Sequence, residues 1–139
     1  MRAYLDSSVI LRVVLGQPDR LAEWPKIASG VASRLVEVEC LRTLDRLRLT
    51  NARIGDEDLA MRRAAVFRVL EALQIVEVSP AILSRAAQPM PAPLGPLDAI
   101  HLASAQLWRS SYGPDLVVAT HDRALAIAAI GDGFRVVGI

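Results

Sequence analysis

Three aspartates of the sequence stand where a carboxylate could take part in chemistry. Asp6 interrupts an apolar run, Asp122 follows the apolar segment 116–120, and Asp98 follows the proline-rich segment 88–96. A carboxylate beside apolar segments is costly unless a cation or hydrogen bonds offset its charge. Aspartate is also a favoured N-cap, where it accepts backbone hydrogen bonds at the start of a helix. Each of the three is therefore either a helix cap or part of a site.

The positions of these aspartates along the chain favour a shared site. If the apolar segments before Asp6 and Asp122 are parallel strands, both carboxylates lie at one edge of a sheet, where ligands bind at the point of reversed strand order. With Asp98 added, the carboxylates would raise one another's pKa unless a cation lay among them. Oxygen ligands suit Mg²⁺ or Mn²⁺. The sequence lacks the Cys and His cluster typical of a zinc site.

A fourth acid is expected from the segment 33–49, which has the pattern of a helix with Ser33 as its cap. This segment contains two glutamates, Glu37 and Glu39. Glu37 lies within the apolar stripe of the predicted helix and Glu39 lies at its edge. The helical periodicity does not choose between them, and both could be surface residues.

Strand and helix patterns alternate along the chain, which predicts an α/β fold, a three-layer α/β/α sandwich with a mainly parallel central sheet of about five short strands. We expect one domain over residues 1–139. Strands are predicted around Tyr4 and over 30–32, 75–78, 116–120 and 134–139; helices are predicted over 7–15, 19–29, 33–49, 55–74, 80–88, 97–111 and 122–131. Pro25 should bend or interrupt the helix over 19–29.

Composition narrows the class of protein. With 53% hydrophobic and 22% charged residues, the chain should be globular. It has no apolar run of the roughly 20 residues that a membrane span needs, and we expect no targeting segment. The single cysteine, Cys40, allows no internal disulfide, so we expect a buried thiol in a cytoplasmic protein.

The charge of the chain argues against a protein that wraps duplex DNA, because the net charge is only +1. All but one of the 16 basic side chains are arginines, and many of them lie within 42–68. Guanidinium groups suit phosphates. A solvated helix surface is the favoured interpretation of this segment.

Four short motifs occur in the order found in a known family. They are YLDSSVIL, SRLVEVECLRTL, LDAIHLASA and ATHDRAL. Together they resemble the PIN-domain ribonucleases, most closely the VapC-type toxins of bacterial toxin–antitoxin pairs. The second motif selects Glu39 over Glu37 and adds Arg42, which can also pair with Glu39 on the same helix face. His121 is a mild departure, because an aromatic residue is common there.

The resemblance implies a metal-dependent endoribonuclease that cuts single-stranded or loop RNA (tRNA, rRNA or mRNA) and acts as a toxin. It also implies a homodimer and a small antitoxin that inserts a segment into the acidic pocket. Mg²⁺ or Mn²⁺ would be held by Asp6, Glu39, Asp98 and Asp122. Thr120 could hold a metal-bound water or a substrate oxygen, and Ser8 is a weaker candidate for that role.

Two rival functions and one residue remain open at this point. The acids could merely cap helices in a non-catalytic module that binds RNA or an antitoxin. An aspartate-dependent phosphohydrolase is disfavoured, since Ser8 stands where such an enzyme of the haloacid type needs a second aspartate. A receiver-type fold would need a lysine near the last strand, and the only lysine is Lys26. His101 could act as an acid or base, but a local hydrogen bond within its helix is the favoured interpretation.

Overall fold

The computed structural model describes residues 1–51 and 53–139. Within these residues, five strands form a single sheet in the order β3-β2-β1-β4-β5, and every neighbouring pair is parallel. The predicted α/β class and the parallel sheet of short strands are thus confirmed. The strands are β1 (Arg2–Leu5), β2 (Ser29–Ser33), β3 (Leu73–Val76), β4 (Val117–Ala119) and β5 (Arg135–Val137).

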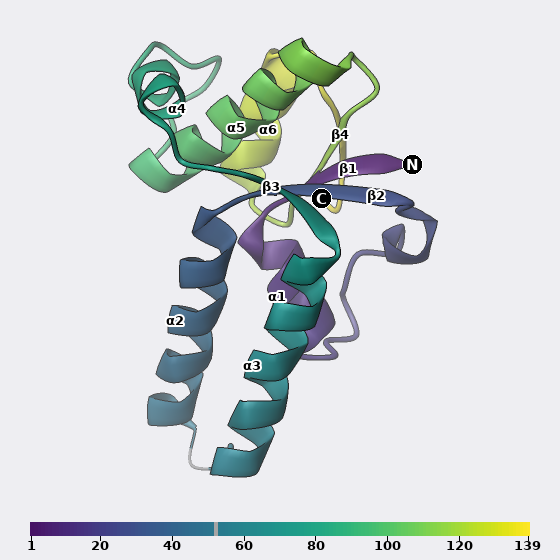
Figure 1. The fold of residues 1–139 in the computed structure, drawn as a ribbon, viewed down its shortest axis with the longest axis vertical. Helices are drawn as coiled ribbons and strands as arrows, with labels where there is room; N and C mark the ends of the chain where they lie inside the picture. Colours follow the sequence, from purple (N-terminus) through teal and green to yellow (C-terminus); the bar gives the residue numbers. More distant parts are fainter. Residues whose placement is uncertain (52) are drawn as a thin grey trace.

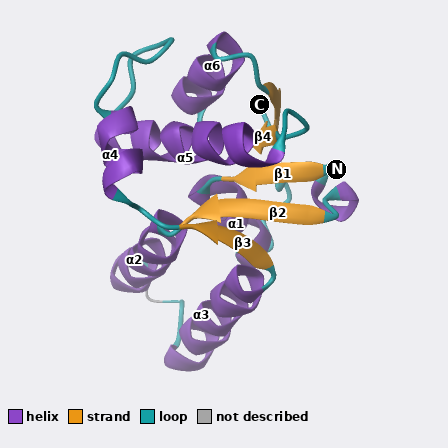
Figure 2. Ribbon diagram, turned by 45° about the horizontal axis from the view of Figure 1, so that its top comes forward, coloured by secondary structure: helices purple, strands orange, loops and turns teal. Residues whose placement is uncertain are grey.

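Helices cover both faces of this sheet and complete three layers (Figures 1 and 2). One layer contains α1, α2 and α3, and the other contains α4, α5 and α6. None of the helices formed by the described residues is long and apolar enough to cross a bilayer. Their bounds are α1 (Ser7–Val14), α2 (Leu35–Thr50), α3 (Asp56–Glu71), α4 (Pro80–Ala86), α5 (Pro96–Tyr112) and α6 (Arg123–Gly131).

The core has two halves, one on each face of the sheet, and β1 contributes to both. Ala3 and Leu5 pack in the cluster on the side of α1, α2 and α3, whereas Tyr4 packs in the cluster on the side of α5 and α6. Successive side chains of a strand point to opposite faces, and a sheet covered on both faces needs apolar residues on both. Tyr4 therefore projects from the sheet toward α5.

Helix capping, one of the two alternatives for these aspartates, is found for two of the three. Asp6 is the N-cap of α1 and Asp122 is the N-cap of α6, and each accepts hydrogen bonds from backbone N–H groups of its helix. Asp98 caps nothing, because α5 begins at Pro96 with Gly95 as its N-cap. Proline suits the first helical position, where its missing N–H costs no hydrogen bond. Asp98 consequently lies inside the first turn of α5 with a free carboxylate.

Some predicted elements were wrong or displaced. Of the helix predicted over 19–29, only a 3₁₀ turn at Trp24–Lys26 forms, because Pro25, where an interruption was expected, has no N–H and its ring disrupts a longer helix. Strand β3 begins two residues before the predicted segment 75–78, since α3 already ends at Glu71. Ser33 ends β2 and is not the N-cap of α2, although its hydroxyl accepts a bond from the N–H of Leu35 at 3.3 Å.

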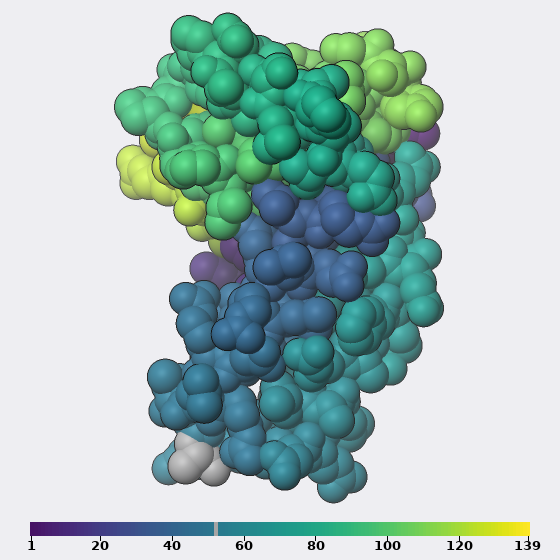
Figure 3. Space-filling view, turned by 60° about the vertical axis from the view of Figure 1, so that its left-hand side comes forward, coloured from purple at the N-terminus to yellow at the C-terminus, as the bar shows by residue number. Residues whose placement is uncertain are grey.

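Helices α2 and α3 lie side by side and project from the sheet as an arm (Figures 1 and 3). The arginines of this arm pair largely with its own acids: Arg42 and Arg63 both contact Asp45, and Arg62 contacts Asp58. Such exposed pairs contribute little stability, but they neutralise the positive charge that would attract a phosphate. The arm fits the favoured interpretation, a solvated helix surface.

Gly138 fixes the last turn of the chain against the end of β4. Its φ is +101°, and a Cβ there would lie 2.6 Å from the backbone oxygen of Thr120. Its own carbonyl oxygen lies 2.6 Å from Nδ1 of His121. Only glycine meets both demands, the left-handed backbone and the close approach.

We expect Gly138→Ala to lower the free energy of unfolding by about 2 kcal/mol or more, because a non-glycine residue is strained at this φ. Urea denaturation would measure the loss. Gly55→Ala is the matched control: Gly55 caps α3 at a φ of −78°, and nothing lies within 4 Å of the added Cβ. The control should lose no more than about 1 kcal/mol. Equal losses in the two variants would contradict the close approach.

Candidate active site

The candidate site lies where the strand order reverses. From β1 the chain proceeds to β2 and β3 on one side of the sheet and then crosses to β4 and β5 on the other. The ends of β1 and β4 are thus neighbours, with Leu5 beside Ala119 in the register. This is the place at which parallel α/β sheets bind ligands. Asp6 and Thr120 are the first residues beyond these two ends.

The carboxylate of Asp6 is buried, at 4% exposure, and donors surround it. Its Oδ1 accepts from the backbone N–H and the hydroxyl of Ser8, at 2.6 and 2.5 Å. Its Oδ2 accepts from the hydroxyl of Thr120, which in turn accepts from the backbone N–H of Asp122 at 2.9 Å. A carboxylate oxygen can accept two hydrogen bonds, so Oδ2 keeps a free lone pair. Thr120 joins the first and the last of the predicted acids.

Both predicted hydroxyl residues belong to this network. Besides its bond to Asp6, the Ser8 hydroxyl accepts from the backbone N–H of His121 at 2.9 Å. Thr120 is fully buried, and its hydroxyl already has two protein partners. The roles predicted for Ser8 and Thr120 in holding water or a substrate oxygen stay predictions. In this structure the two hydroxyls hold Asp6 in place.

Asp98 is the least engaged of the acids. It is half-buried, and it makes no hydrogen bond or ion pair with any residue that the structure describes. Burial raises the pKa of Asp98 above its ordinary value, and the negative charges of Asp122, Asp6 and Glu39 raise it further, with His101 opposing them. The like charges of the other three predicted acids thus act on Asp98. In Figure 2 the start of α5, beside α4, lies on the same side as the arrowheads of β1 and β2.

Glu39, and not Glu37, faces this group. An oxygen of Glu39 lies 2.8 Å from Nε2 of His101, and only 19% of the Glu39 side chain is exposed. Glu37 is 38% exposed and contacts Arg34 at 3.5 Å. The expected pair between Arg42 and Glu39 was wrong. Arg42 is largely exposed and binds Asp45 at 2.9 Å, one turn further from the sheet.

His101 is buried, and the expectation of a local hydrogen bond within its helix was also wrong. Its two ring nitrogens contact residues of other elements, Tyr4 of β1 at 2.9 Å and Glu39 of α2 at 2.8 Å. Burial raises the pKa of Tyr4, and the charges of Asp6 and Glu39 add to the shift. The phenol thus remains protonated. The pattern of single residues held no signal for this contact, because it joins three separate elements.

The four acids carry an unbalanced negative charge. No arginine or lysine of the described chain forms an ion pair with Asp6, Glu39, Asp98 or Asp122. Burial, together with the charges of Glu39 and Asp6, raises the pKa of the nearby Cys40 to about 12, so it is the buried thiol that was predicted. Within the described residues, no three His, Cys, Asp or Glu side chains are close enough to hold an ion as they stand.

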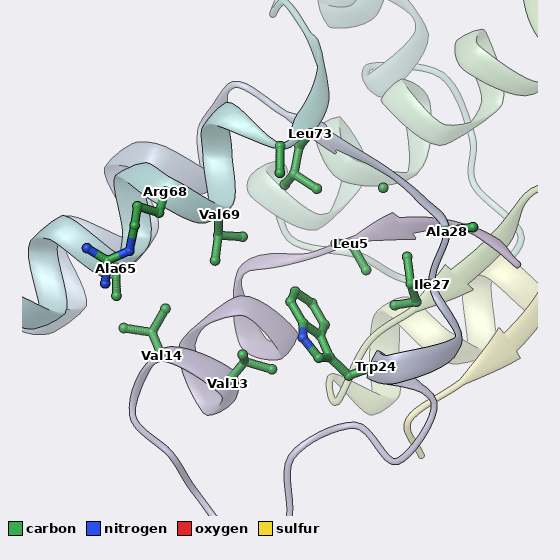
Figure 4. A pocket seen from close by; sticks show the side chains of 12 residues that line it. Leu5, Val13, Val14, Trp24, Ile27, Ala28, Ala65, Arg68, Val69 and Leu73 are labelled. Atoms are coloured by element: carbon green, nitrogen blue, oxygen red, sulfur yellow. The ribbon is translucent and has the colours of Figure 1, made fainter.

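A cavity of about 510 Å³ opens elsewhere, between the sheet and the helices α1 and α3 (Figure 4). Its walls are mostly apolar, with Trp24, Val13 and Leu73 among the residues that line it, and Arg68 at its side. None of the four acids lines it. The cavity is therefore separate from the candidate site.

The raised pKa of Asp98 is open to direct measurement. We expect its carboxyl carbon, followed by NMR in metal-free protein, to titrate above the ordinary value of 3.8. Asp122→Asn should move the Asp98 titration to lower pH, because it removes the like charge that raises the pKa of Asp98 most. Glu37→Gln should leave it unchanged, since Glu37 is not among the groups that act on Asp98. If the Asp98 titration is the same in Asp122→Asn as in the parent protein, the two carboxyls do not interact.

The fold recurs in solved structures of low sequence identity. A toxin–antitoxin complex from Klebsiella pneumoniae is 19% identical, with a TM-score of 0.68, over 97% of this chain and 95% of that one. VapBC2 from Rickettsia felis, bound to a DNA fragment from its promoter, is 9% identical with a TM-score of 0.64, over 98% and 97%. VapC20 from Mycobacterium tuberculosis, a sarcin-ricin loop cleaving toxin, is 14% identical with a TM-score of 0.57, over 89% and 94%.

Sequence comparison with curated proteins found no match. The family model described as PIN domain matches residues 3–131, which include all four acids and Thr120. This match confirms the resemblance on which Glu39 was preferred to Glu37. The chain belongs to the PIN domain family.

Proposed function

We propose that this protein is a divalent-metal-dependent endoribonuclease that cuts single-stranded or loop RNA and acts as the VapC-type toxin of a toxin–antitoxin pair. One observation carries the proposal. Acids from four different segments gather at the end of β1 without an arginine or lysine partner among the described residues, and they are Asp6, Glu39, Asp98 and Asp122. Membership of a family of nucleases supports hydrolysis of a phosphodiester as their task.

The chemistry of the donor set fits Mg²⁺ or Mn²⁺. All four donors are carboxylates, which hard divalent cations prefer. The pKa of Asp98 is raised first by burial and then by like charges, and a cation would relieve that repulsion. The side chains as they stand form no closed cage, so we propose that those not held by hydrogen bonds turn toward the ion. The bound ion would supply Lewis acidity, lowering the pKa of a water and offsetting charge at the phosphate.

The protein's own residues divide the remaining work. Asp6 is immobilised by Ser8 and Thr120, so it presents a fixed oxygen. Asp122 uses Oδ1 to cap α6 at 2.9 Å, and its other oxygen has no hydrogen-bond partner among the described residues. Asp98 is half-buried and makes no hydrogen bond with the described residues, so no such bond fixes the direction of its carboxylate. We propose that these three, with Glu39, bind the ion, and that Thr120 sets the spacing between Asp6 and Asp122.

The negative charge of the four acids also bears on the proposed RNA substrate and the proposed antitoxin partner. RNA would approach an acidic site through a bridging cation, and tRNA, rRNA or mRNA are all candidates; the similar VapC20 is described as cleaving the sarcin-ricin loop. The similar Klebsiella structure is a toxin–antitoxin complex. We propose a small antitoxin that places a cationic group among the acids and so excludes metal and RNA. A cytoplasmic homodimer, with each chain a single domain over residues 1–139, completes the proposal.

A non-catalytic module is the second candidate, and one observation favours it. Asp6 and Asp122 both cap helices, so their presence would be explained without metal or catalysis. Capping does not explain Asp98, which caps nothing and carries a raised pKa. Loss of Asp98 therefore separates the two candidates more sharply than loss of either capping aspartate.

We expect Asp6→Asn and Asp98→Asn each to reduce RNA cleavage by about 100-fold or more, because losing a metal ligand forfeits several kcal/mol of transition-state stabilisation. Asparagine also caps helices, so Asp6→Asn should keep the fold. Cleavage of labelled RNA in Mg²⁺ or Mn²⁺, with EDTA as a blank, would measure the loss. Glu39→Gln should impair cleavage strongly, whereas Glu37→Gln, its matched control, should stay within about twofold of the parent.

Full cleavage by Asp98→Asn would exclude Asp98 from the metal site. Absence of metal-dependent cleavage by the parent protein would leave the non-catalytic module. Equal effects of Glu39→Gln and Glu37→Gln would show that the wrong glutamate had been assigned to the site.

The antitoxin proposal predicts a small protein, encoded beside this one, that co-purifies with it. The complex should cleave RNA at least about tenfold more slowly than the free protein, since a bound cationic segment competes with the metal for the same carboxylates. Rates of the purified complex and of the protein freed by partial denaturation and refolding would test this. Equal rates would contradict insertion into the site.

A further inference from the structure

A buried chain of hydrogen bonds leads from the core to Glu39. Tyr4 and His101 are each 1% exposed. The Tyr4 hydroxyl lies 2.9 Å from Nδ1 of His101, and Nε2 of His101 lies 2.8 Å from Oε2 of Glu39. The three residues come from β1, α5 and α2, and α2 and α5 cover opposite faces of the sheet. The chain therefore ties both helical layers and the sheet to one carboxylate.

For an imidazole that carries one ring proton, the donors and acceptors around it decide which nitrogen holds that proton. A neutral phenol can donate its hydrogen, and Glu39 as a carboxylate can only accept. Nδ1 of His101 then accepts from Tyr4, which leaves the ring proton on Nε2, where it is donated to Glu39. This tautomer satisfies every member of the chain. Oε2 of Glu39 is thus occupied by His101, while Oε1 has no hydrogen-bond partner among the described residues.

The same geometry argues against a direct chemical role for His101. A general acid or base must reach the proton that it transfers, within about 3 Å or through one water. His101 is buried and both of its ring nitrogens are occupied by protein groups. Its aromatic ring also packs edge-on against Tyr4, with ring centroids 6.0 Å apart. His101 acts on the site through Glu39.

We propose that Tyr4 and His101 are positioning residues that hold Glu39 by Oε2 and leave Oε1 as its oxygen for a divalent ion. This inference rests on the proposed function, since it takes Glu39 to be a metal ligand. Groups that hydrogen-bond to a metal ligand fix its orientation, and their loss typically weakens metal binding 10–100-fold. Neither Tyr4 nor His101 needs to touch metal or RNA for this effect.

The tautomer can be read in the metal-free parent protein. Nitrogen-15 NMR of the histidine rings, with His101 assigned by comparison with His101→Gln, should show Nε2 protonated and Nδ1 as an acceptor. Tyr4→Phe removes the donor to Nδ1 and should shift the Nδ1 resonance and weaken the tautomer preference. A ring protonated on Nδ1, or a parent spectrum that Tyr4→Phe leaves unchanged, would overturn the proposal. This measurement needs neither metal nor activity.

Mn²⁺ titration calorimetry supplies the second measurement. We expect His101→Phe, which keeps a ring and loses both hydrogen bonds, to bind Mn²⁺ roughly tenfold more weakly than the parent. His101→Gln keeps an N–H near the place of Nε2 and should recover most of the affinity. The matched control is Gln106→Met on the same helix, because Gln106 is buried and bonded to Asp132 at 2.9 Å, away from the acids. The control should lose stability but bind Mn²⁺ like the parent.

The outcomes separate this inference from the function on which it rests. If Glu39→Gln weakens Mn²⁺ binding and His101→Phe does not, the positioning role is wrong and the proposed function stands. If Glu39→Gln and Asp98→Asn both bind Mn²⁺ like the parent, the proposed metal site itself fails. If His101→Phe does not fold, Tyr4→Phe tests the same chain of hydrogen bonds. We expect Tyr4→Phe to bind Mn²⁺ severalfold more weakly than the parent. Parental affinity in Tyr4→Phe would overturn the proposal.

Discussion

The buried carboxylate of Asp6 is the constraint on which the rest of the site depends. A charge at 4% exposure is tolerated only if hydrogen bonds replace its water. Those bonds come from the start of α1 and from Thr120 at the end of β4, so satisfying Asp6 fixes the helix, the strand and their spacing together. Because Thr120 also accepts from the backbone of Asp122, the start of α6 is placed by the same requirement. Gly138 packs against the backbone of Thr120 and so helps to hold Thr120 in place.

Helix N-termini explain how several acids can gather without cationic partners. Asp6 and Asp122 cap α1 and α6, and Asp98 lies in the first turn of α5. The N-terminus of a helix carries a partial positive charge and unpaired N–H groups, which favour negative side chains nearby. Capping and metal binding are therefore compatible roles for one aspartate. The fold supports these aspartates with backbone dipoles, and within the described residues it leaves one oxygen of Asp122 and the carboxylate of Asp98 without a hydrogen-bond partner.

Local patterns in the sequence were enough to predict the alternating elements, the parallel sheet and the position of Asp6 and Asp122 at strand ends. They failed where the outcome depends on distant residues. A helical wheel placed Glu37 and Glu39 almost equally, because what separates them is a histidine 62 residues further along the chain. Arg42 was expected to pair with Glu39, but it pairs with Asp45 instead.

Glu39 differs physically from the other three acids, and this difference accounts for its unusual partner. It belongs to α2, which begins at Leu35, so it lies beyond the first turn, within which a helix dipole is felt. It caps nothing, and its backbone neighbours offer no free N–H. A half-buried carboxylate in that position needs a donor from another element. An arginine would neutralise the charge that we propose a metal uses, whereas an imidazole with a single ring proton, as in the proposed tautomer, donates a hydrogen bond and leaves the charge in place. The pairing of Glu39 with His101, itself held by Tyr4, meets this requirement with residues from three elements.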